Sequence, residues 1–400
     1  MTTFSITYAD GQQTTFTPTL TYPSHDAEID SAFYGILRAW PTFLERLVLE
    51  AAPPGTVGAI IAVSTLGIDR ITDLYEGLLG RAPTTAEVVA GQQSFANTED
   101  SGSLYNQLAT SDAASAAITQ AFVDETGAPP SQAQAVNTKV AADLGSNEDL
   151  RAYVAALYAP AAIQAYYEGV VGRPPSWSEV LATQRLLAEG ESLTNLRRGA
   201  VNSPEVAQAV GAIWQSVLDR PAEPAAVSAA VSAIANGSTL SDTRAAVARS
   251  PEAAMRVGDI YEQVLGRAAE SSAVAADQAA MGAGASLAQV RSAVAHSAEA
   301  TADIQTIYQQ VLGRAAETAA VVGAETGLAN GATLSGLRAS VAGSAEATAD
   351  VQSLYQNVLG RAAEGSAVIN AETVLAQGGT LAGLRIATAG SAEAAAQIGA

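Results

Sequence analysis

The stretch from Tyr308 to Arg314, YQQVLGR, decides the fold, because close variants of it recur down the chain. Its glycine position returns at intervals of 47, 45, 47, 47, 47 and 47 residues. That position is occupied by Gly80, Gly127, Gly172, Asp219, Gly266, Gly313 and Gly360. Seven copies at nearly one period are typical of an array of helical repeats.

Two more positions of the motif recur with the glycine. An aromatic residue lies near its start, at Tyr75, Phe122, Tyr167, Trp214, Tyr261, Tyr308 and Tyr355. An arginine follows the glycine position at Arg81, Arg173, Arg220, Arg267, Arg314 and Arg361, whereas the second copy has Ala128. These structural repeat positions are the residues that we expect to matter most in this chain.

Each repeat has the pattern of about three helices. The first helix is predicted to begin at an N-capping serine, eleven residues before the aromatic. These serines are Ser64, Ser111, Ser203, Ser250, Ser297 and Ser344. Apolar residues then follow at i, i+3, i+4, i+7 and i+8, as from Ile304 to Leu312, and form one stripe. The glycine beyond the stripe is predicted to end the helix in a left-handed conformation.

The second helix covers stretches such as 269–280 and ends at a glycine-rich turn. The third is short, as in Leu334–Arg338, and stops at the next capping serine. None of these helices can bury its apolar stripe alone, so neighbouring repeats must share a core. The sequence therefore predicts an all-α, solenoid-like helical repeat array over residues 64–400, with seven repeats and the start of an eighth.

The second repeat and the two ends depart from the pattern. In the second repeat, about 111–160, Glu125 and Thr126 replace Val-Leu, and Ala159-Pro160 replaces the capping serine, which predicts different packing or a bend. Residues 1–24 are predicted as a β-hairpin that packs on the first helices or pairs with another chain. Residues 25–63 are predicted as an N-terminal helical segment, interrupted at Pro41. The eighth repeat opens at Ser391 and its aromatic would fall at position 402, which predicts a longer protein or a partner that completes the last helix.

The composition narrows the class of partner. Alanine supplies 88 of the 400 residues, and 48% hydrophobic against 15% charged residues allow a buried core. A formal net charge of −20 disfavours nucleic acid and a bare anionic lipid surface. The absence of cysteine excludes disulfides, thiol catalysis and zinc–thiolate sites. No apolar run approaches the roughly 20 residues of a membrane span, and the N-terminus lacks the pattern of a signal peptide.

Residues that could carry chemistry are few. His25 and His296 are far apart, and neither has a second ligand at metal-binding spacing. No nucleotide-binding, nucleophile-elbow, zinc-protease or EF-hand motif is present. The carboxylate pairs Glu99-Asp100 and Glu148-Asp149 are interpreted as solvated turns rather than acid–base pairs. We therefore expect no enzyme activity and assign no catalytic or cofactor-binding residue.

The repeated arginine and aromatic have structural explanations. A ladder of guanidinium groups could bind carboxylates or phosphates, but bonds to helix carbonyls and salt bridges between repeats are the favoured interpretation. The aromatic lies mid-stripe and is predicted to belong to the core. Trp177 is the one plausible sugar-stacking residue, whereas Trp40 is predicted to pack within its helix.

Taken together, Tyr-x-x-Val-Leu-Gly-Arg-x-x-Glu, Gly-x-x-Leu-x-x-Leu-Arg and Ser-x-Glu resemble a bacterial helical repeat domain of unknown function related to phycobilisome linker domains. The resemblance covers about 64–400 and is strongest over Tyr261–Arg385. That domain occurs in secreted surface-layer and repeats-in-toxin type proteins, so the resemblance implies an extracellular, non-enzymatic role and type I secretion. The family commonly has an Asp and a Gly soon after Gly-Arg, where this chain has Ala268-Ala269-Glu270. The composition also resembles the lipopolysaccharide-anchoring region of alphaproteobacterial surface-layer proteins.

Three interpretations stay open. The favoured one is an extracellular structural protein of a surface layer or other cell-surface assembly, exported without an N-terminal signal peptide. It would anchor to lipopolysaccharide or another surface polysaccharide, with Ca²⁺ bridging the anionic partners, and associate with copies of itself. One alternative is an adhesin-type array for a glycan or a protein. The other is an intracellular linker scaffold, which the net charge of −20 disfavours because such linkers tend to be basic.

Overall fold

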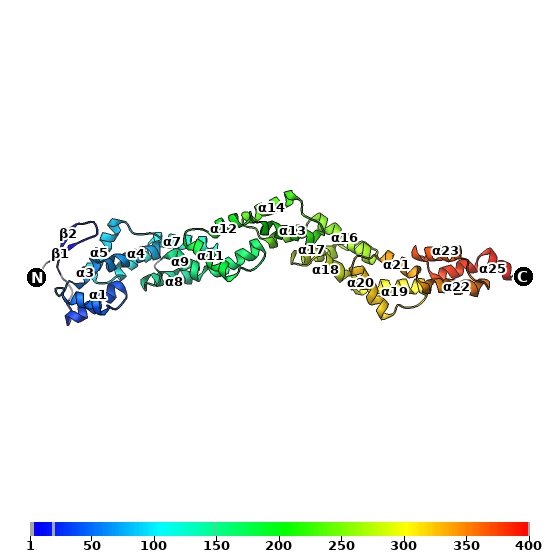
Figure 1. The fold of residues 1–400 in the computed structure, drawn as a ribbon, viewed down its shortest axis with the longest axis horizontal. Helices are drawn as coiled ribbons and strands as arrows, with labels where there is room; N and C mark the ends of the chain where they lie inside the picture. The colour runs from blue at the N-terminus through cyan, green and yellow to red at the C-terminus, as the bar shows by residue number, and fades with distance from the viewer. Residues whose placement is uncertain (1–3, 18–20, 148, 399–400) are drawn as a thin grey trace. The chain divides into compact units, whose positions relative to one another are not determined.

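The computed structural model describes residues 4–17, 21–147 and 149–398 (Figure 1). The chain divides into two compact units, residues 1–203 with 235–237 and residues 204–234 with 238–400. Apart from one two-stranded sheet, the described residues form helices joined by short turns. The predicted all-α helical array with a small N-terminal hairpin is confirmed.

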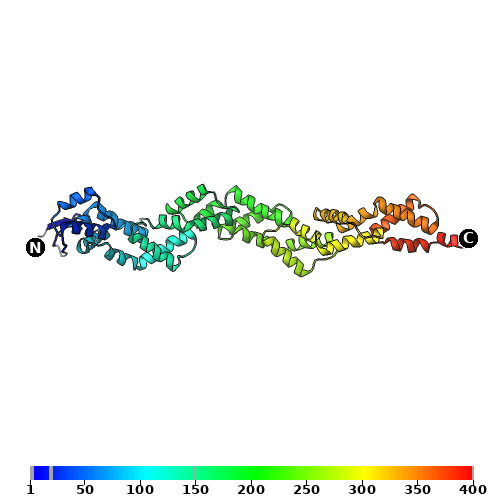
Figure 2. The ribbon, with the colours of Figure 1, turned by 90° about the horizontal axis from the view of Figure 1, so that it is seen from below.

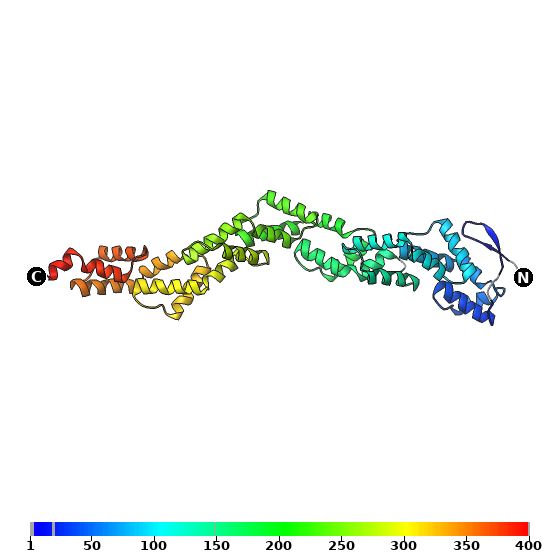
Figure 3. The ribbon, with the colours of Figure 1, turned by 180° about the vertical axis from the view of Figure 1, so that it is seen from behind.

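The hairpin pairs β1 (Phe4–Thr7) with β2 (Gln13–Phe16) in antiparallel register. Ile6 and Tyr8 are buried, and β1 contacts the third helix of the chain, α3 (Val57–Val63). The backbone N–H of Ala9 donates to Gln92 Oε1 at 2.9 Å. The hairpin therefore packs on the first helices, as Figure 3 also shows. Residues 1–3 and 18–20 of the predicted hairpin lie outside the described residues.

Two further helices precede the repeats, α1 (His25–Leu37) and α2 (Phe43–Glu50). Arg38 ends α1 in a left-handed conformation, with φ of 54°. Thr42 then starts α2 through a capping box with Glu45. The predicted interruption at Pro41 is thus a short turn between two helices.

The repeats contain three helices each. The first helices are α4 (Thr65–Leu79), α7 (Asp112–Thr126), α10 (Ala159–Tyr166) with its π-helical continuation η1 (Tyr167–Val171), α13 (Pro204–Leu218), α16 (Pro251–Leu265), α19 (Ala298–Leu312) and α22 (Ala345–Leu359), and α25 (Ala392–Ile398) follows them. The second helices are α5 (Thr85–Thr98), α8 (Gln132–Asp143), α11 (Trp177–Ala188), α14 (Pro224–Ala235), α17 (Ser271–Gly282), α20 (Thr318–Ala329) and α23 (Gly365–Ala376). The third helices are α6 (Gly102–Ala109), α9 (Leu150–Leu157), α12 (Leu193–Ala200), α15 (Leu240–Ala248), α18 (Leu287–Ala295), α21 (Leu334–Ala342) and α24 (Leu381–Ala389).

The ends of the first helices follow the capping pattern of the sequence. Their N-capping serine side chains accept a hydrogen bond from the backbone N–H three residues on, at Ser64, Ser111, Ser250, Ser297 and Ser344. The terminating glycines have φ between 62° and 88°. Asp219 adopts the same left-handed conformation, with φ of 54°, although it has a side chain.

Neighbouring repeats interlock in the second unit (Figures 1 and 2). The third helix α18 packs on the first helix of its own repeat, α16, and on the second helix of the next, α20. The next third helix, α21, packs on α19 and α23 in the same way. Val311, Val341 and Leu375, from these last three helices, belong to one buried cluster. Neighbouring repeats therefore share a core, as the isolated stripes require.

The second repeat accommodates its unusual residues locally. Glu125 is completely buried in α7, and Arg151 of α9 lies 2.8 Å from its Oε1 as an ion pair. Helix α10 begins at Ala159, directly after α9 and without a side-chain cap. It continues into the wider turns of η1 before Gly172 ends it.

Candidate functional site

In the second unit the repeated arginine joins one repeat to the next. Each guanidinium binds both carboxylate oxygens of a glutamate 32 residues on, in the first turn of the next first helix. The pairs are Arg220–Glu252, Arg267–Glu299, Arg314–Glu346 and Arg361–Glu393. Their Nη2–Oε2 distances are 2.6–2.8 Å. This bidentate geometry occupies the guanidinium edge that a carboxylate or phosphate ligand would need.

In the first unit the arginine at the same position binds a glutamate of its own repeat, six residues on. Arg81 binds Glu87, and Arg173 binds Glu179, each with two nitrogens at 2.7–3.0 Å. Both glutamates are also partners in the capping box that starts the second helix. The arginine hydrogen bonds lower the pKa of each glutamate to about 2.

The repeated aromatic is only partly a core residue, which corrects the sequence interpretation. Tyr75 and Phe122 are buried, but Tyr167, Trp214, Tyr261, Tyr308 and Tyr355 are half-buried. In five repeats the motif arginine lies over the tyrosine ring, 5.4–5.9 Å from its centroid. The guanidinium and the ring therefore make a cation–π contact. The tyrosine ring is half-buried because it lies at the edge of the apolar stripe, where one of its faces meets the arginine.

A second arginine position, on the third helix, also connects repeats. Arg244, Arg291 and Arg338 donate from Nε to a carbonyl at the end of the next repeat's second helix, at 2.7–2.9 Å. Their Nη2 groups donate to a further carbonyl four residues on, at 2.6–2.8 Å. The carbonyls of Met281, Leu328 and Leu375 lie in the last turn of the helix and accept a bond of 3.2–3.3 Å from the backbone N–H three residues on. The arginine adds a charged donor to each, so it caps the helix. Sequence reasoning noted the Leu-x-x-Leu-Arg pattern but missed this role, because the partners are 37 and 41 residues away.

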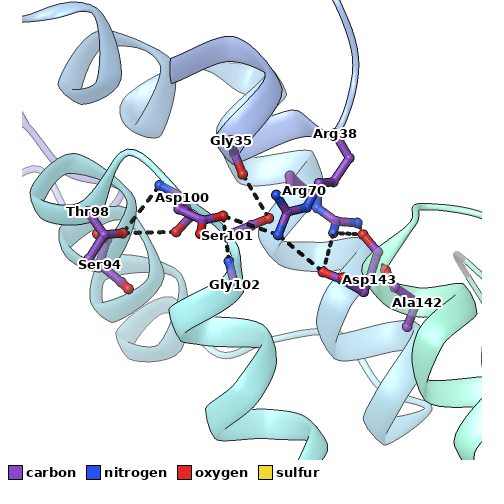
Figure 4. Close-up of polar contacts among 10 residues, drawn as sticks. All are labelled: Gly35, Arg38, Arg70, Ser94, Thr98, Asp100, Ser101, Gly102, Ala142 and Asp143. Atoms are coloured by element: carbon purple, nitrogen blue, oxygen red, sulfur yellow. Dashed lines mark hydrogen bonds and ion pairs between the residues drawn. The ribbon is translucent and has the colours of Figure 1, made fainter. Parts of the chain in front are cut away.

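A different kind of polar site lies in the first unit (Figure 4). Arg38 Nη2 lies 3.2 Å from Asp100 Oδ1 and 3.5 Å from Asp143 Oδ1. Arg70 is buried and donates to the carbonyls of Ala142 and Asp143 at 3.1 and 2.5 Å. Burial lowers the pKa of Arg70, although the Asp143 carboxylate opposes that shift. This network ties the end of α1 to α4, to the turn before α6 and to the end of α8.

Next to this network is a hollow of about 370 Å³, lined in part by Tyr22, Tyr34, Arg38, Trp40 and Glu99. The rings of Tyr34 and Trp40 stack with centroids 5.1 Å apart. Trp40 lies in the turn between α1 and α2 and is 66% exposed. The prediction that Trp40 packs within its helix is therefore wrong. Helix α1 has already ended at Leu37, so Trp40 belongs to no helix and its indole lies at the surface.

The backbone beside the hollow is unusual at two residues. Arg38 and Glu99 both have positive φ, of 54° and 50°, which few side-chain-bearing residues adopt. Gly35 lies so close to Glu99 that a Cβ there would be 2.2 Å from the Glu99 carbonyl oxygen. Such local strain persists only where surrounding contacts hold it in place, and it is often found at functional sites.

Glu99 is buried, so its interpretation as part of a solvated turn is wrong. The Tyr22 hydroxyl donates to Glu99 Oε2, a contact between residues 77 positions apart. Burial raises the pKa of Glu99, and burial with the Glu99 hydrogen bond raises the pKa of Tyr22 to about 12. Asp100, its neighbour, stays half exposed and accepts from Gly102 N–H. The other predicted pair includes Glu148, which lies outside the described residues.

The two histidines have structural roles. His25 lies 3.1 Å from Glu28 and 3.2 Å from the Leu49 carbonyl, while Glu28 accepts from the backbone of Gly55 and Val57. His296 ends α18 and bonds to the Ser292 carbonyl. Within the described residues, no group of three or more His, Asp or Glu side chains is placed to hold a metal ion.

Trp177 starts α11 and is exposed, as a sugar-stacking residue would need to be. Over residues 4–17, 21–147 and 149–398, no helix combines the length and the apolar character needed to cross a bilayer. Comparison of the chain with protein-family models, with curated proteins and with solved structures gives no match.

Proposed function

We propose that this chain is a non-enzymatic structural protein of an extracellular cell-surface assembly, such as a surface layer. The repeats would form a spacer that anchors to surface polysaccharide and associates with copies of itself. The observation that carries the proposal is the use of the repeated arginines. In the second unit both arginine positions bind the next repeat, so the most regular chemical feature of the chain serves to hold the array together.

The surface charge supports a bridged attachment rather than direct binding. A chain with a net charge of −20 is repelled by an anionic polysaccharide unless a divalent cation lies between them. Such a cation would be shared by carboxylates of both partners, so it needs no preformed cluster within the protein. Release of the protein by a calcium chelator is the expected consequence.

The test is the location of the native product, using intact cells washed with and without a calcium chelator. We expect the protein on the outer surface and in the chelator wash, with a cytosolic marker protein retained in the cells as a control for lysis. Detection in the cytosol alone would contradict export and would favour an intracellular linker scaffold. If the protein is on the surface but the chelator does not release it, the bridging by Ca²⁺ is contradicted, whereas the surface location is not.

A second candidate function, a glycan-binding adhesin, is favoured by the hollow beside Trp40. An exposed indole stacked on Tyr34, with Asp30 and Arg38 nearby, offers an apolar face and charged groups at one place. The rest of the lining, which includes Ser31, Thr98 and Asp100, is largely polar, so the hollow offers hydrogen-bonding groups beside the aromatic rings, as a sugar would need. We would measure binding of purified surface polysaccharide to Trp40→Ala and Trp177→Ala variants. Binding to a monomer that is lost only in Trp40→Ala would favour the adhesin over the assembly protein.

A further inference from the structure

Helix α2 presents an apolar side that the described residues of its own unit leave exposed. Four of its eight side chains, Phe43, Leu44, Leu47 and Val48, are large, apolar and 54–79% exposed. They fall at i, i+1, i+4 and i+5, so they form one contiguous face of the helix. Single exposed apolar side chains are common on protein surfaces, but a contiguous patch marks an interaction site.

The contacts between α2 and α1 fix the orientation of α2 so that its apolar side faces the solvent. Arg46 binds Asp30 of α1, and the Leu49 carbonyl contacts the His25 ring. Leu49 is the one residue of α2 that is buried. The helix is therefore anchored through its polar side and Leu49, and rotation that would bury the apolar side would break these bonds.

The charges around this side argue against a lipid surface. Interfacial helices have basic polar faces that attract anionic lipid headgroups. Here the neighbouring charges include Asp26, Glu45 and Glu50, and the cation Arg46 is already paired with Asp26 and Asp30. An anionic bilayer would be repelled by these carboxylates, whereas a second copy can cover the apolar side with its own and leave its carboxylates in water at the rim of the interface.

We propose that the face formed by Phe43, Leu44, Leu47 and Val48 is a self-association surface, covered by the same face of a second copy of the chain. A two-fold interface brings identical patches together, so one apolar face is enough to form it. Aromatic side chains bury roughly 150–250 Å² each. Each copy exposes one phenylalanine and three aliphatic side chains by 54–79%, so two such faces bury on the order of 1,000 Å², the size of a weak, reversible interface. This inference rests on the proposed self-association and says where it occurs.

The test is the association state of the purified full chain, measured by sedimentation velocity over a range of concentrations. We expect a reversible dimer whose dissociation constant rises by roughly 30-fold or more in Leu44→Asp/Leu47→Asp, because both changes bury charge at the centre of the interface. Ile369→Asp, at a similarly exposed site on α23, is the matched control and should dimerise as the wild type does. Circular dichroism checks that each variant is folded.

Single-cysteine variants give an independent readout, since the chain has no cysteine of its own. Under mild oxidation we expect Leu47→Cys to form a disulfide-linked dimer and Ile369→Cys to stay mostly monomeric. A wild-type chain that is monomeric at the highest concentrations would overturn the inference. So would unchanged dimerisation of the α2 variant, or a monomer that instead binds phosphatidylglycerol vesicles. These results leave the cell-surface location untouched, which the wash experiment tests separately.

Discussion

At the residue scale, the two repeated arginines make different kinds of contact with the next repeat. Arg314 binds an exposed glutamate and lies over Tyr308, so water screens much of its ion pair. Arg338 instead donates to the carbonyls of Leu375 and Gly379, and it reaches Gln310 Oε1 at 2.7 Å. Leu375 is completely buried. The Leu375 carbonyl therefore has little access to a replacement hydrogen bond from water, whereas Gly379 is half-buried.

This difference predicts unequal costs for two alanine substitutions. Arg338→Ala should lower the free energy of unfolding by about 2 kcal/mol, because it removes the charged donor from the buried Leu375 carbonyl and from the Gly379 carbonyl in the following turn. Arg314→Ala should cost clearly less. Urea unfolding of both variants, followed by circular dichroism, makes the comparison. An equal or larger cost for Arg314→Ala would contradict the conclusion that Arg338 stabilises the array more than Arg314 does.

Glu125 predicts a pH dependence. Burial raises its pKa to about 7 in the folded chain, despite the nearby Arg151, whereas an unfolded glutamate has a pKa of about 4.3. Between these two values the folded state keeps the proton that the unfolded state has lost, so stability falls as the pH rises from about 4.3 towards 7. The loss levels off about one pH unit above 7 and amounts to at most about 4 kcal/mol.

Glu125→Gln should remove that dependence. We expect the variant to be more stable than the wild type at pH 8 and similar to it at pH 5, because the amide keeps the shape of the protonated acid without its charge. Urea unfolding followed by tryptophan fluorescence at both pH values measures the difference. A variant that loses stability between pH 5 and pH 8 as much as the wild type would assign the dependence to other groups.

At the scale of the element, the close approach of α1 to the turn after α5 is controlled by a glycine. A Cβ on Gly35 would lie 2.2 Å from the Glu99 carbonyl oxygen, which is backbone and cannot rotate away. Gly35→Ala should therefore push α1 from the turn and destabilise the first unit by several times the usual cost of a helix substitution. The Ser101 bonds to the Gly35 carbonyl would be lost with it.

Gly199→Ala is the matched control for this prediction. Gly199 lies in α12 of the same unit, and a Cβ there meets nothing within 4 Å. Alanine should stabilise that helix by roughly 0.5–1 kcal/mol, because glycine loses more backbone freedom on folding. Thermal unfolding by circular dichroism compares the two. If both substitutions move the melting temperature in the same direction, the close approach of Gly35 is not limiting.

The local sequence pattern predicted where the helices of the repeats begin and end, but not which helices and side chains contact one another. The 47-residue period, the serine caps and the left-handed glycines are properties of neighbouring residues, and they reappear in the structure. The burial of Glu99 depends on Tyr22, 77 residues away, so no local pattern could report it. The apolar stripe of α2 reads like a core-facing stripe, since periodicity shows that a face is apolar and not which side of the helix finds a partner.

At the scale of the whole molecule, the repeats make the second unit divisible in steps of 47 residues. Stability of such an array is close to a sum of repeat and neighbour terms. Deletion of residues 298–344 joins Ser297 to α22, so Ser297 can cap that helix. It also places Arg267 opposite Glu346, and Arg291 opposite the carbonyls that Arg338 now binds. Every connection that the deletion removes is therefore replaced by an equivalent one.

We expect this deletion variant to fold, with a helix content per residue like that of the full chain and a melting temperature within a few degrees of it. Deletion of residues 298–330 is the control, because it removes α19 and α20 but leaves α21. Arg267 then loses Glu299, and Arg291 loses the Leu328 carbonyl. That variant should melt early and be cut readily by a protease at its junction. Circular dichroism and limited proteolysis measure both properties. If the two deletions were equally damaging, the regular connections between repeats would not be what holds the array together.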